Sequence, residues 1–247
     1  MRATRCNFLL FDLGNTLMHA RGDWEEIHSR GDQALTENLS RYNVKLDSRL
    51  FRERLHAYYL QRDKDFQETT YHFVLDELLT EMGYGEVPDS IVRSALDAMY
   101  SITQTNWMLE TDTRETISQL HVLGYRLGIL SNAGDDKDVQ QLVHGFGLDL
   151  FFDFVLTSAK CFYRKPHPRA FELALAHWNA PPQEAVMIGD SLEADIQGAQ
   201  ISKLRNVWIK RRAHYTNEQM QKILPEITIQ QLSELPSILA NLTIVRQ

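Results

Sequence analysis

Acidic, basic, hydroxyl and amide side chains gather in loops that follow or adjoin short apolar runs of this sequence. These chemistry-bearing residues are Asp12, Ser131, Asn132, Lys165, Asp190 and Asp195. Carboxylates are hard oxygen ligands of the kind that Mg²⁺ prefers, and a lysine ammonium supplies a point charge to a phosphate. Together the residue types therefore fit a magnesium ion beside a bound phosphoryl group.

The elements that must position these loops follow from the hydrophobic pattern. Short apolar runs predict strands at 7–11, 125–130, 152–156, 185–188 and 206–209, with a weaker candidate at 227–229. Helical periodicity appears between them, at 114–123 and 168–178. Apolar strands that alternate with helices indicate a parallel sheet covered on both faces. The carboxyl ends of its strands form the expected ligand site.

Residues 20–107 differ, because they show helical periodicity and no convincing strand. Helices are expected from Trp24 and over 46–60, 73–82 and 91–100, with Asp47, Pro88 and Asp89 as start residues. We therefore predict an α/β fold in which a Rossmann-like three-layer parallel sheet occupies 1–19 and 108–247. An α-helical bundle domain is inserted at 20–107, and hinges are expected at 18–21 and 107–110.

Four segments carry the chemistry in a fixed order: FDLGNTL, ILSNAGD, YRKPHPRAF and GDSLEADIQGA. Their reference residues Asp12, Ser131, Lys165 and Asp190 are separated by 119, 34 and 25 positions. In this order they resemble the four motifs of the haloacid dehalogenase (HAD) superfamily of hydrolases. The resemblance covers roughly residues 5–18 and 108–240, and the helical block lies where this family places a C1-type cap.

The resemblance implies a magnesium-dependent phosphatase of small phosphorylated molecules. Asp12 would be the nucleophile that forms an aspartyl phosphate, which water then cleaves. The catalytic residues that it implies are Asp12, Ser131 and Lys165. The phosphate-binding residues that it implies are Ser131, Asn132 and Lys165. The metal site that it implies comprises Asp12, the backbone carbonyl of Gly14, Asp190 and, through water, Asp195.

Position 14 departs from the family pattern. The phosphatase version of the first motif is Asp-x-Asp, and its second acid protonates the leaving group, whereas this chain has Gly14. General acid–base catalysis typically contributes about 10²–10⁴-fold in rate. The substrate would then need a good leaving group, such as a sugar 1-phosphate or an acyl phosphate, or a cap residue would supply the proton, or the protein would be slow or inactive. The cap candidates for proton donation are His28, His56 and His72.

Two other functions fit part of the pattern. A 2-haloacid dehalogenase also lacks the second acid, but its fourth motif is not built to hold magnesium. The acids of GDSLEAD favour phosphoryl chemistry, because carboxylates that face each other without a cation repel. A non-catalytic phosphate-ligand sensor on the same fold is the remaining alternative. The cap aromatics are more typical of a helical core than of a pocket; they are Trp24, Tyr58, Tyr59, Phe66, Tyr71 and Phe73.

Composition limits the partners. The formal net charge of −7 disfavours nucleic acid and anionic membranes. We interpret the basic run at 210–212 as a solvated loop. No apolar stretch approaches the length of a membrane span, and two cysteines require no oxidising compartment. We expect a cytoplasmic protein, whereas the substrate and the oligomeric state stay open.

Overall fold

One parallel sheet organises the α/β layer. The computed structural model describes residues 4–212, 214–241 and 243–244. Its six-stranded sheet has the order β6-β5-β2-β7-β8-β9, with parallel neighbours throughout. The strands are β2 (Phe8–Phe11), β5 (Arg126–Ser131), β6 (Phe154–Thr157), β7 (Ala185–Gly189), β8 (Arg205–Ile209) and β9 (Ile227–Ile229). The predicted fold class is thereby confirmed, and all six predicted strands are present.

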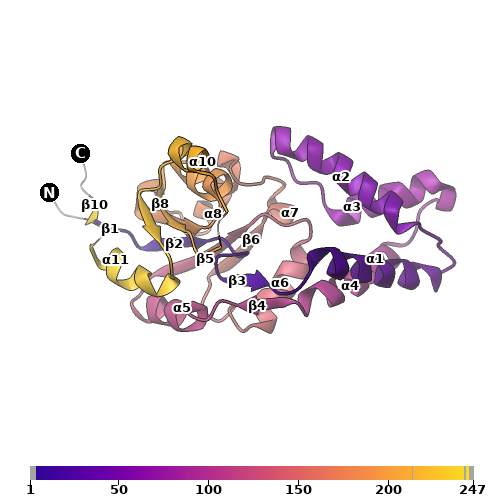
Figure 1. Ribbon diagram of the computed structural model, residues 1–247, viewed down its shortest axis with the longest axis horizontal. Helices are drawn as coiled ribbons and strands as arrows, with labels where there is room; N and C mark the ends of the chain where they lie inside the picture. The colour runs from indigo at the N-terminus through magenta and orange to yellow at the C-terminus, as the bar shows by residue number, and fades with distance from the viewer. Residues whose placement is uncertain (1–3, 213, 242, 245–247) are drawn as a thin grey trace.

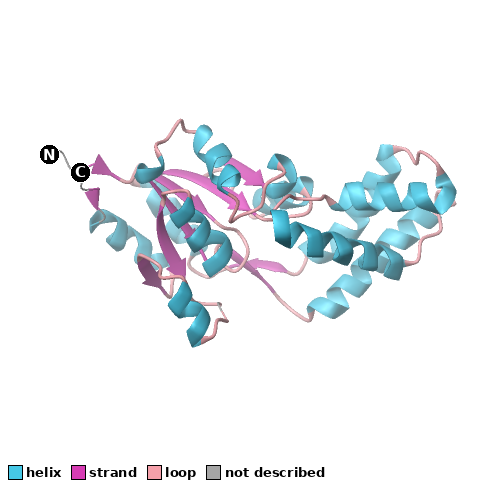
Figure 2. Cartoon of the chain, turned by 90° about the horizontal axis from the view of Figure 1, so that it is seen from above, coloured by secondary structure: helices cyan, strands magenta, loops and turns pink. Residues whose placement is uncertain are grey.

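Helices cover both faces of this sheet, which makes three layers (Figures 1 and 2). Successive strand residues point to opposite faces, so Leu9 belongs to one buried cluster and Leu10 to another. The first cluster packs under α5 (Thr113–Val122), α6 (Asp136–Gly145) and α11 (Leu235–Asn241). The second packs under α8 (Pro168–Ala176) and α9 (Gly198–Ile201).

Shorter elements complete this part of the chain. They are β1 (Thr4–Arg5), paired with β10 (Thr243–Ile244), α7 (Ser158–Cys161), α10 (Asn217–Lys222), η2 (Pro182–Glu184), η3 (Leu192–Gln197) and η4 (Leu232–Glu234). Among the helices that the structure describes, none combines the length and the apolar character that a bilayer crossing requires.

A separate helical block extends from one end of the α/β layer (Figure 1). It comprises α1 (Trp24–Ser40), α2 (Ser48–Asp65), α3 (Tyr71–Leu79), η1 (Thr80–Tyr84) and α4 (Asp89–Gln104). The block has its own buried core, in which Leu35 and Phe51 meet Leu96. Asp47 caps α2 as predicted, because its side chain accepts a hydrogen bond from the backbone N–H of Arg49.

A two-stranded ribbon joins the block to the α/β layer (Figure 1). Strands β3 (Met18–Ala20) and β4 (Trp107–Leu109) pair in antiparallel register. The backbone N–H of Arg21 extends the pairing by donating to the carbonyl of Asn106 at 2.8 Å. Both predicted hinge segments lie in this ribbon, whose strands the hydrophobic pattern did not predict.

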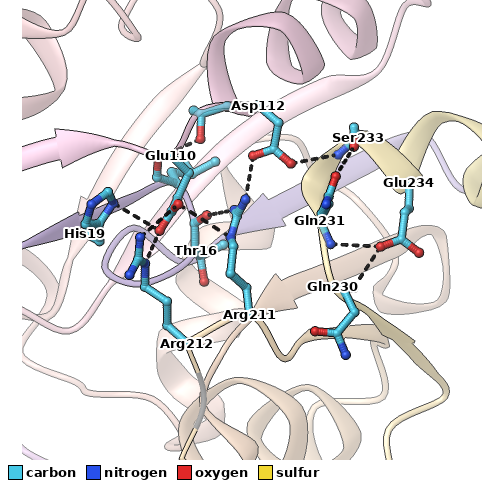
Figure 3. A network of polar contacts seen from close by, with 12 residues as sticks. Thr16, His19, Glu110, Asp112, Arg211, Arg212, Gln230, Gln231, Ser233 and Glu234 are labelled. Atoms are coloured by element: carbon cyan, nitrogen blue, oxygen red, sulfur yellow. Dashed lines mark hydrogen bonds and ion pairs between the residues drawn. The ribbon is translucent and has the colours of Figure 1, made fainter.

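Two residues of the basic run at 210–212 are held by carboxylates at the base of this ribbon (Figure 3). Arg211 Nη1 lies 2.8 Å from Asp112 Oδ1, and Arg212 forms an ion pair with Glu110. His19 Nδ1 of β3 lies 3.1 Å from the same Glu110 carboxylate, which is buried. For Arg211 and Arg212, the interpretation of this run as a solvated loop is therefore wrong. The partners of both arginines lie about a hundred positions earlier, where sequence-local reasoning cannot find them.

Candidate active site

Three carboxylates meet at the carboxyl end of the sheet. Asp12 follows β2 and Asp190 follows β7, which are parallel neighbours, while Asp195 lies in η3. One carboxylate oxygen from each lies within 4.8 Å of the others. The backbone N–H of Asp12 donates to the carbonyl of Ile188 at 2.9 Å, which ties the two strand ends together. The sheet register thus brings residues 178 or more positions apart into one site.

Gly189 makes room for one of these carboxylates. A Cβ at position 189 would lie 2.2 Å from Asp195 Oδ2, far inside contact distance. The same oxygen accepts a hydrogen bond from the backbone N–H of Ser191 at 3.0 Å. The glycine before Asp190 is therefore required for Asp195 to enter the cluster.

Lys165 joins the carboxylates from a different loop. Its Nζ lies 2.7 Å from Asp12 Oδ1 and 2.7 Å from Asp195 Oδ1, and its side chain is buried. Asn132 holds this loop, because its Oδ1 accepts from the backbone N–H of Lys165 and its Nδ2 donates to the Lys165 carbonyl. The side chain of Asn132 is thus used to position the lysine. The phosphate-binding role predicted for Asn132 therefore falls to its backbone N–H.

The cluster carries an excess of negative charge. Burial, together with the charges of Asp12 and Asp195, raises the pKa of Asp190 to about 8. Burial likewise raises the pKa of Asp195, although the Lys165 ammonium opposes the shift. Burial by itself lowers the pKa of Lys165, but the two carboxylates beside it outweigh that effect and raise it. Ionised together, three carboxylates and one ammonium leave two negative charges, which fits a divalent cation with hard oxygen ligands.

A pocket of about 340 Å³ opens above Asp12. Its α/β-layer wall includes Gly14, the buried Ser131 at the end of β5, and Asp138 of α6. Its opposite wall comes from the helical block and the ribbon and includes Trp24, His28, Arg52, Tyr71 and Trp107. The pocket therefore lies between the two parts of the molecule, where a lid can exclude water.

The structure separates the three histidines proposed as proton donors. His28 lines the pocket. His72 pairs instead with Asp89 at 2.8 Å, and His56 is solvent-exposed. Neither His56 nor His72 is among the pocket-lining residues that the structure describes.

The aromatic residues of the block also divide. Trp24 and Tyr71 line the pocket, whereas Tyr58 and Tyr59 pack against the block's own core and Phe73 is 52% exposed. Tyr71 lies against Gly134 of the Ser131 loop, at which a Cβ would lie 2.6 Å from the ring. Sequence reasoning did not single out several further pocket residues; they are Asn15, Arg52, Trp107 and Asp138. For Trp107, the sequence signal that could have pointed to the pocket was its position at the start of the predicted hinge segment 107–110.

Two strips of polar contact hold the helical block on the α/β layer. Between α4 and α6, Arg93 Nη1 lies 2.5 Å from Asp135 Oδ2 and Gln104 Nε2 donates to Asp138 Oδ1 at 2.8 Å. In the second strip, the buried Glu68 carboxylate contacts Ser158 and Arg164. The block in this structure is therefore closed over the pocket.

Comparison with known proteins agrees with this geometry. The haloacid dehalogenase-like hydrolase family model matches residues 7–202. The chain belongs to this family. A glyceraldehyde 3-phosphate phosphatase of Pyrococcus furiosus is 27% identical over 95% of this chain and 93% of its own length.

Solved structures share the fold over most of the chain. A HAD phosphatase from Thermococcus onnurineus has a TM-score of 0.63 at 23% identity, covering 94% of this chain and 97% of its own. A 2-haloacid dehalogenase from Pseudomonas syringae has a TM-score of 0.69 at 23% identity, covering 95% and 98%. Because both chemistries occur on this fold, the fold alone does not choose between them. The side chains around Asp12 must decide.

Proposed function

We propose that this protein is a magnesium-dependent phosphatase that hydrolyses phosphate monoesters of small molecules through Asp12. The single observation that carries the proposal is the buried cluster in which Lys165 Nζ lies 2.7 Å from Asp12 beside two further carboxylates. A phosphatase needs such a cation site, whereas a carboxylate that displaces halide does not. The similarity to the glyceraldehyde 3-phosphate phosphatase of Pyrococcus furiosus also favours phosphoryl chemistry.

Each residue of the site would have a separate role in this reaction. Asp12 attacks phosphorus and becomes an aspartyl phosphate, which water then cleaves. Lys165 pairs with Asp12 and offsets the charge of the phosphoryl group, while Ser131 and backbone N–H groups near Asn132 hold its oxygens. A magnesium ion held by Asp12, the Gly14 carbonyl and Asp190, with Asp195 through water, would shield the repulsion between nucleophile and phosphate.

We further propose that residues 20–107 form a C1-type cap domain on a core made of residues 1–19 and 108–247. The ribbon of β3 and β4 would be its hinge, and the residues that it adds to the pocket would choose the substrate. Closure of such a lid excludes water from the transferred group.

Replacement of the nucleophile tests the function. With Mg²⁺ and a panel of phosphorylated metabolites, Asp12→Asn should lower turnover at least about 10³-fold. EDTA should abolish the wild-type activity reversibly. Asp149→Asn is the matched control and should keep wild-type rates, because Asp149 pairs with His144 at the exposed surface.

The same assays separate the alternatives. Halide release from 2-haloacids that persists in EDTA would identify a dehalogenase and overturn the proposal. Metal-dependent binding of phosphorylated ligands without any hydrolysis, unchanged in Gly14→Asp, would identify a sensor.

A further inference from the structure

The residue that replaces the family's usual acid lies under an aromatic ring. A Cβ built on Gly14 would be 3.7 Å from Cη2 and 4.0 Å from Cζ3 of Trp107. The φ angle of Gly14 is not positive, so its backbone would accept a side chain without strain. A Cβ at this position would therefore lie in van der Waals contact with the indole.

Trp107 is fixed in this place from two sides. It opens β4, where it pairs with Ala20 of β3. The ring of Trp24 packs on it edge-on, with centroids 5.7 Å apart. Both tryptophans line the pocket that contains Asp12. Aromatic rings therefore line the side of the pocket next to position 14, where the family's general acid would lie.

We propose, resting on the phosphatase function above, that Gly14 and Trp107 act as one unit that selects the leaving group. The unit favours aryl phosphates, the esters of phenols. A phenol has a pKa of about 10, whereas that of an alcohol lies near the value of about 15.7 for water. A phenolate therefore departs without a proton from position 14, and its ring can pack on the faces of Trp107 and Trp24.

The reaction balances without an acid at position 14. An Asp12 oxygen bonds to phosphorus while the bond from phosphorus to the phenolic oxygen breaks, and the electron pair leaves with the phenolate. Solvent protonates the phenolate after it departs. Water then attacks phosphorus of the aspartyl phosphate, and the bond from phosphorus to the Asp12 oxygen breaks, which frees the Asp12 carboxylate. One proton of that water stays on inorganic phosphate and the other passes to solvent.

Kinetics with phenyl phosphate and ethyl phosphate test the proposal. With Mg²⁺, wild-type kcat/KM should favour phenyl phosphate by about 10²-fold or more, the order of a missing general acid. Trp107→Leu should lower kcat/KM for phenyl phosphate roughly 3- to 10-fold more than it lowers kcat/KM for ethyl phosphate, the range of an aromatic contact. Trp178→Leu is the matched control, because Trp178 packs on the opposite face of the sheet.

Restoring the acid tests whether the two positions form a unit. Gly14→Asp alone should change kcat/KM for ethyl phosphate less than about 3-fold, because the indole occupies the space beside the new carboxyl group. The double variant Gly14→Asp/Trp107→Leu should raise it about 10-fold or more, which makes the substitutions non-additive. An equal gain in Gly14→Asp alone, or a wild-type enzyme without preference between the two esters, overturns the proposal.

A binding measurement reports on the indole without turnover. By calorimetry with Mg²⁺, wild type should bind phenylphosphonate more tightly than methylphosphonate, and Trp107→Leu should lose this preference. If wild type binds the two phosphonates equally, the aromatic contact is overturned and the phosphatase function is not. Failure of wild type to hydrolyse either ester overturns the phosphatase function, and leaving-group selection with it. Circular dichroism checks that each variant is folded.

Discussion

The carboxyl groups of Asp190 and Asp195 hold protons more tightly than ordinary aspartates because they are buried next to Asp12. A cation that binds among them must displace those protons. Below the raised pKa of Asp190, protons therefore compete with the metal, and above it they do not. Metal binding and proton release are coupled in this cluster.

We expect the affinity for Mg²⁺ to fall as the pH is lowered from 8.5 to 6. Each displaced proton contributes up to about a tenfold change per pH unit, so calorimetric titrations at pH 6, 7 and 8.5 resolve the effect. Asp190→Asn should bind more weakly and with a smaller dependence on pH, whereas Asp149→Asn should follow wild type. Affinity that is constant over this range would contradict the proposed ligand set.

Asp138 provides a second test, of stability. Burial raises its pKa to about 6, so between about pH 4 and pH 6 the folded state binds more protons than the unfolded state. Its ionisation therefore destabilises the fold as the pH rises through this window. Relative to wild type, Asp138→Asn should gain roughly 1–3 kcal/mol more unfolding free energy at pH 7.5 than at pH 4, measured by urea denaturation. A gain that is equal at both pH values would contradict this.

For individual residues, the sequence predicted the position of a site side chain where that residue ends or follows a strand. Asp12, Ser131 and Asp190 could be placed together because the ends of parallel strands share one edge of the sheet. Asn132 shows the limit, since its side chain contacts the backbone of Lys165. Residue type does not say which of two nearby groups an amide will bind. Trp107 and Arg52 were missed because their direction depends on how the helical block packs.

Among the elements, the β3–β4 ribbon depends on charges at its base. The buried Glu110 contacts His19, Arg211 and Arg212 (Figure 3). Removing one partner from a buried charged network leaves the remaining charges uncompensated, at a cost of about 3–5 kcal/mol.

Glu110→Gln should therefore lower the free energy of unfolding by several kcal/mol, on the order of that cost, in urea denaturation. Glu172→Gln is the matched control, since Glu172 forms an exposed pair with Arg169. It should change stability by less than about 1 kcal/mol. An effect of Glu110→Gln as small as that of the control would show that the network does not stabilise the ribbon.

The elements themselves were largely predictable. Apolar runs located each strand of the main sheet, because a strand buried on both faces has few polar positions. Helix α6 was not predicted. It begins in a run of acidic residues, of which Asp135 caps the helix and contacts Arg93 of the helical block. Strands β3 and β4 were missed because each has three residues and pairs only with the other, across the whole helical insertion.

At the scale of the whole molecule, the two strips of polar contact hold the helical block closed over the pocket. Glu68 is the charged centre of one of the two contact strips, with 1% of its side chain exposed beside Arg164. Loss of its charge should shift the population towards open forms, because the closed form loses contacts that the open form does not have.

Glu68→Gln should thus speed hydrogen exchange in the segments 66–71 and 158–164 and raise KM more than it lowers kcat. Glu218→Gln should change neither, since Glu218 pairs with Lys222 at an exposed helix surface. Unchanged exchange in Glu68→Gln would mean that the charge of Glu68 is not needed to keep the helical block closed.

The ribbon also has a consequence for how this architecture can vary. Its two strands leave and re-enter the α/β layer side by side, paired from Met18 with Leu109 to Ala20 with Trp107. To the rest of the chain, the whole insertion is therefore equivalent to the tip of a hairpin, and tips of this kind accept foreign segments well. A graft that keeps these paired ends could exchange one lid for another, and the specificity with it, while the chemistry below stayed intact.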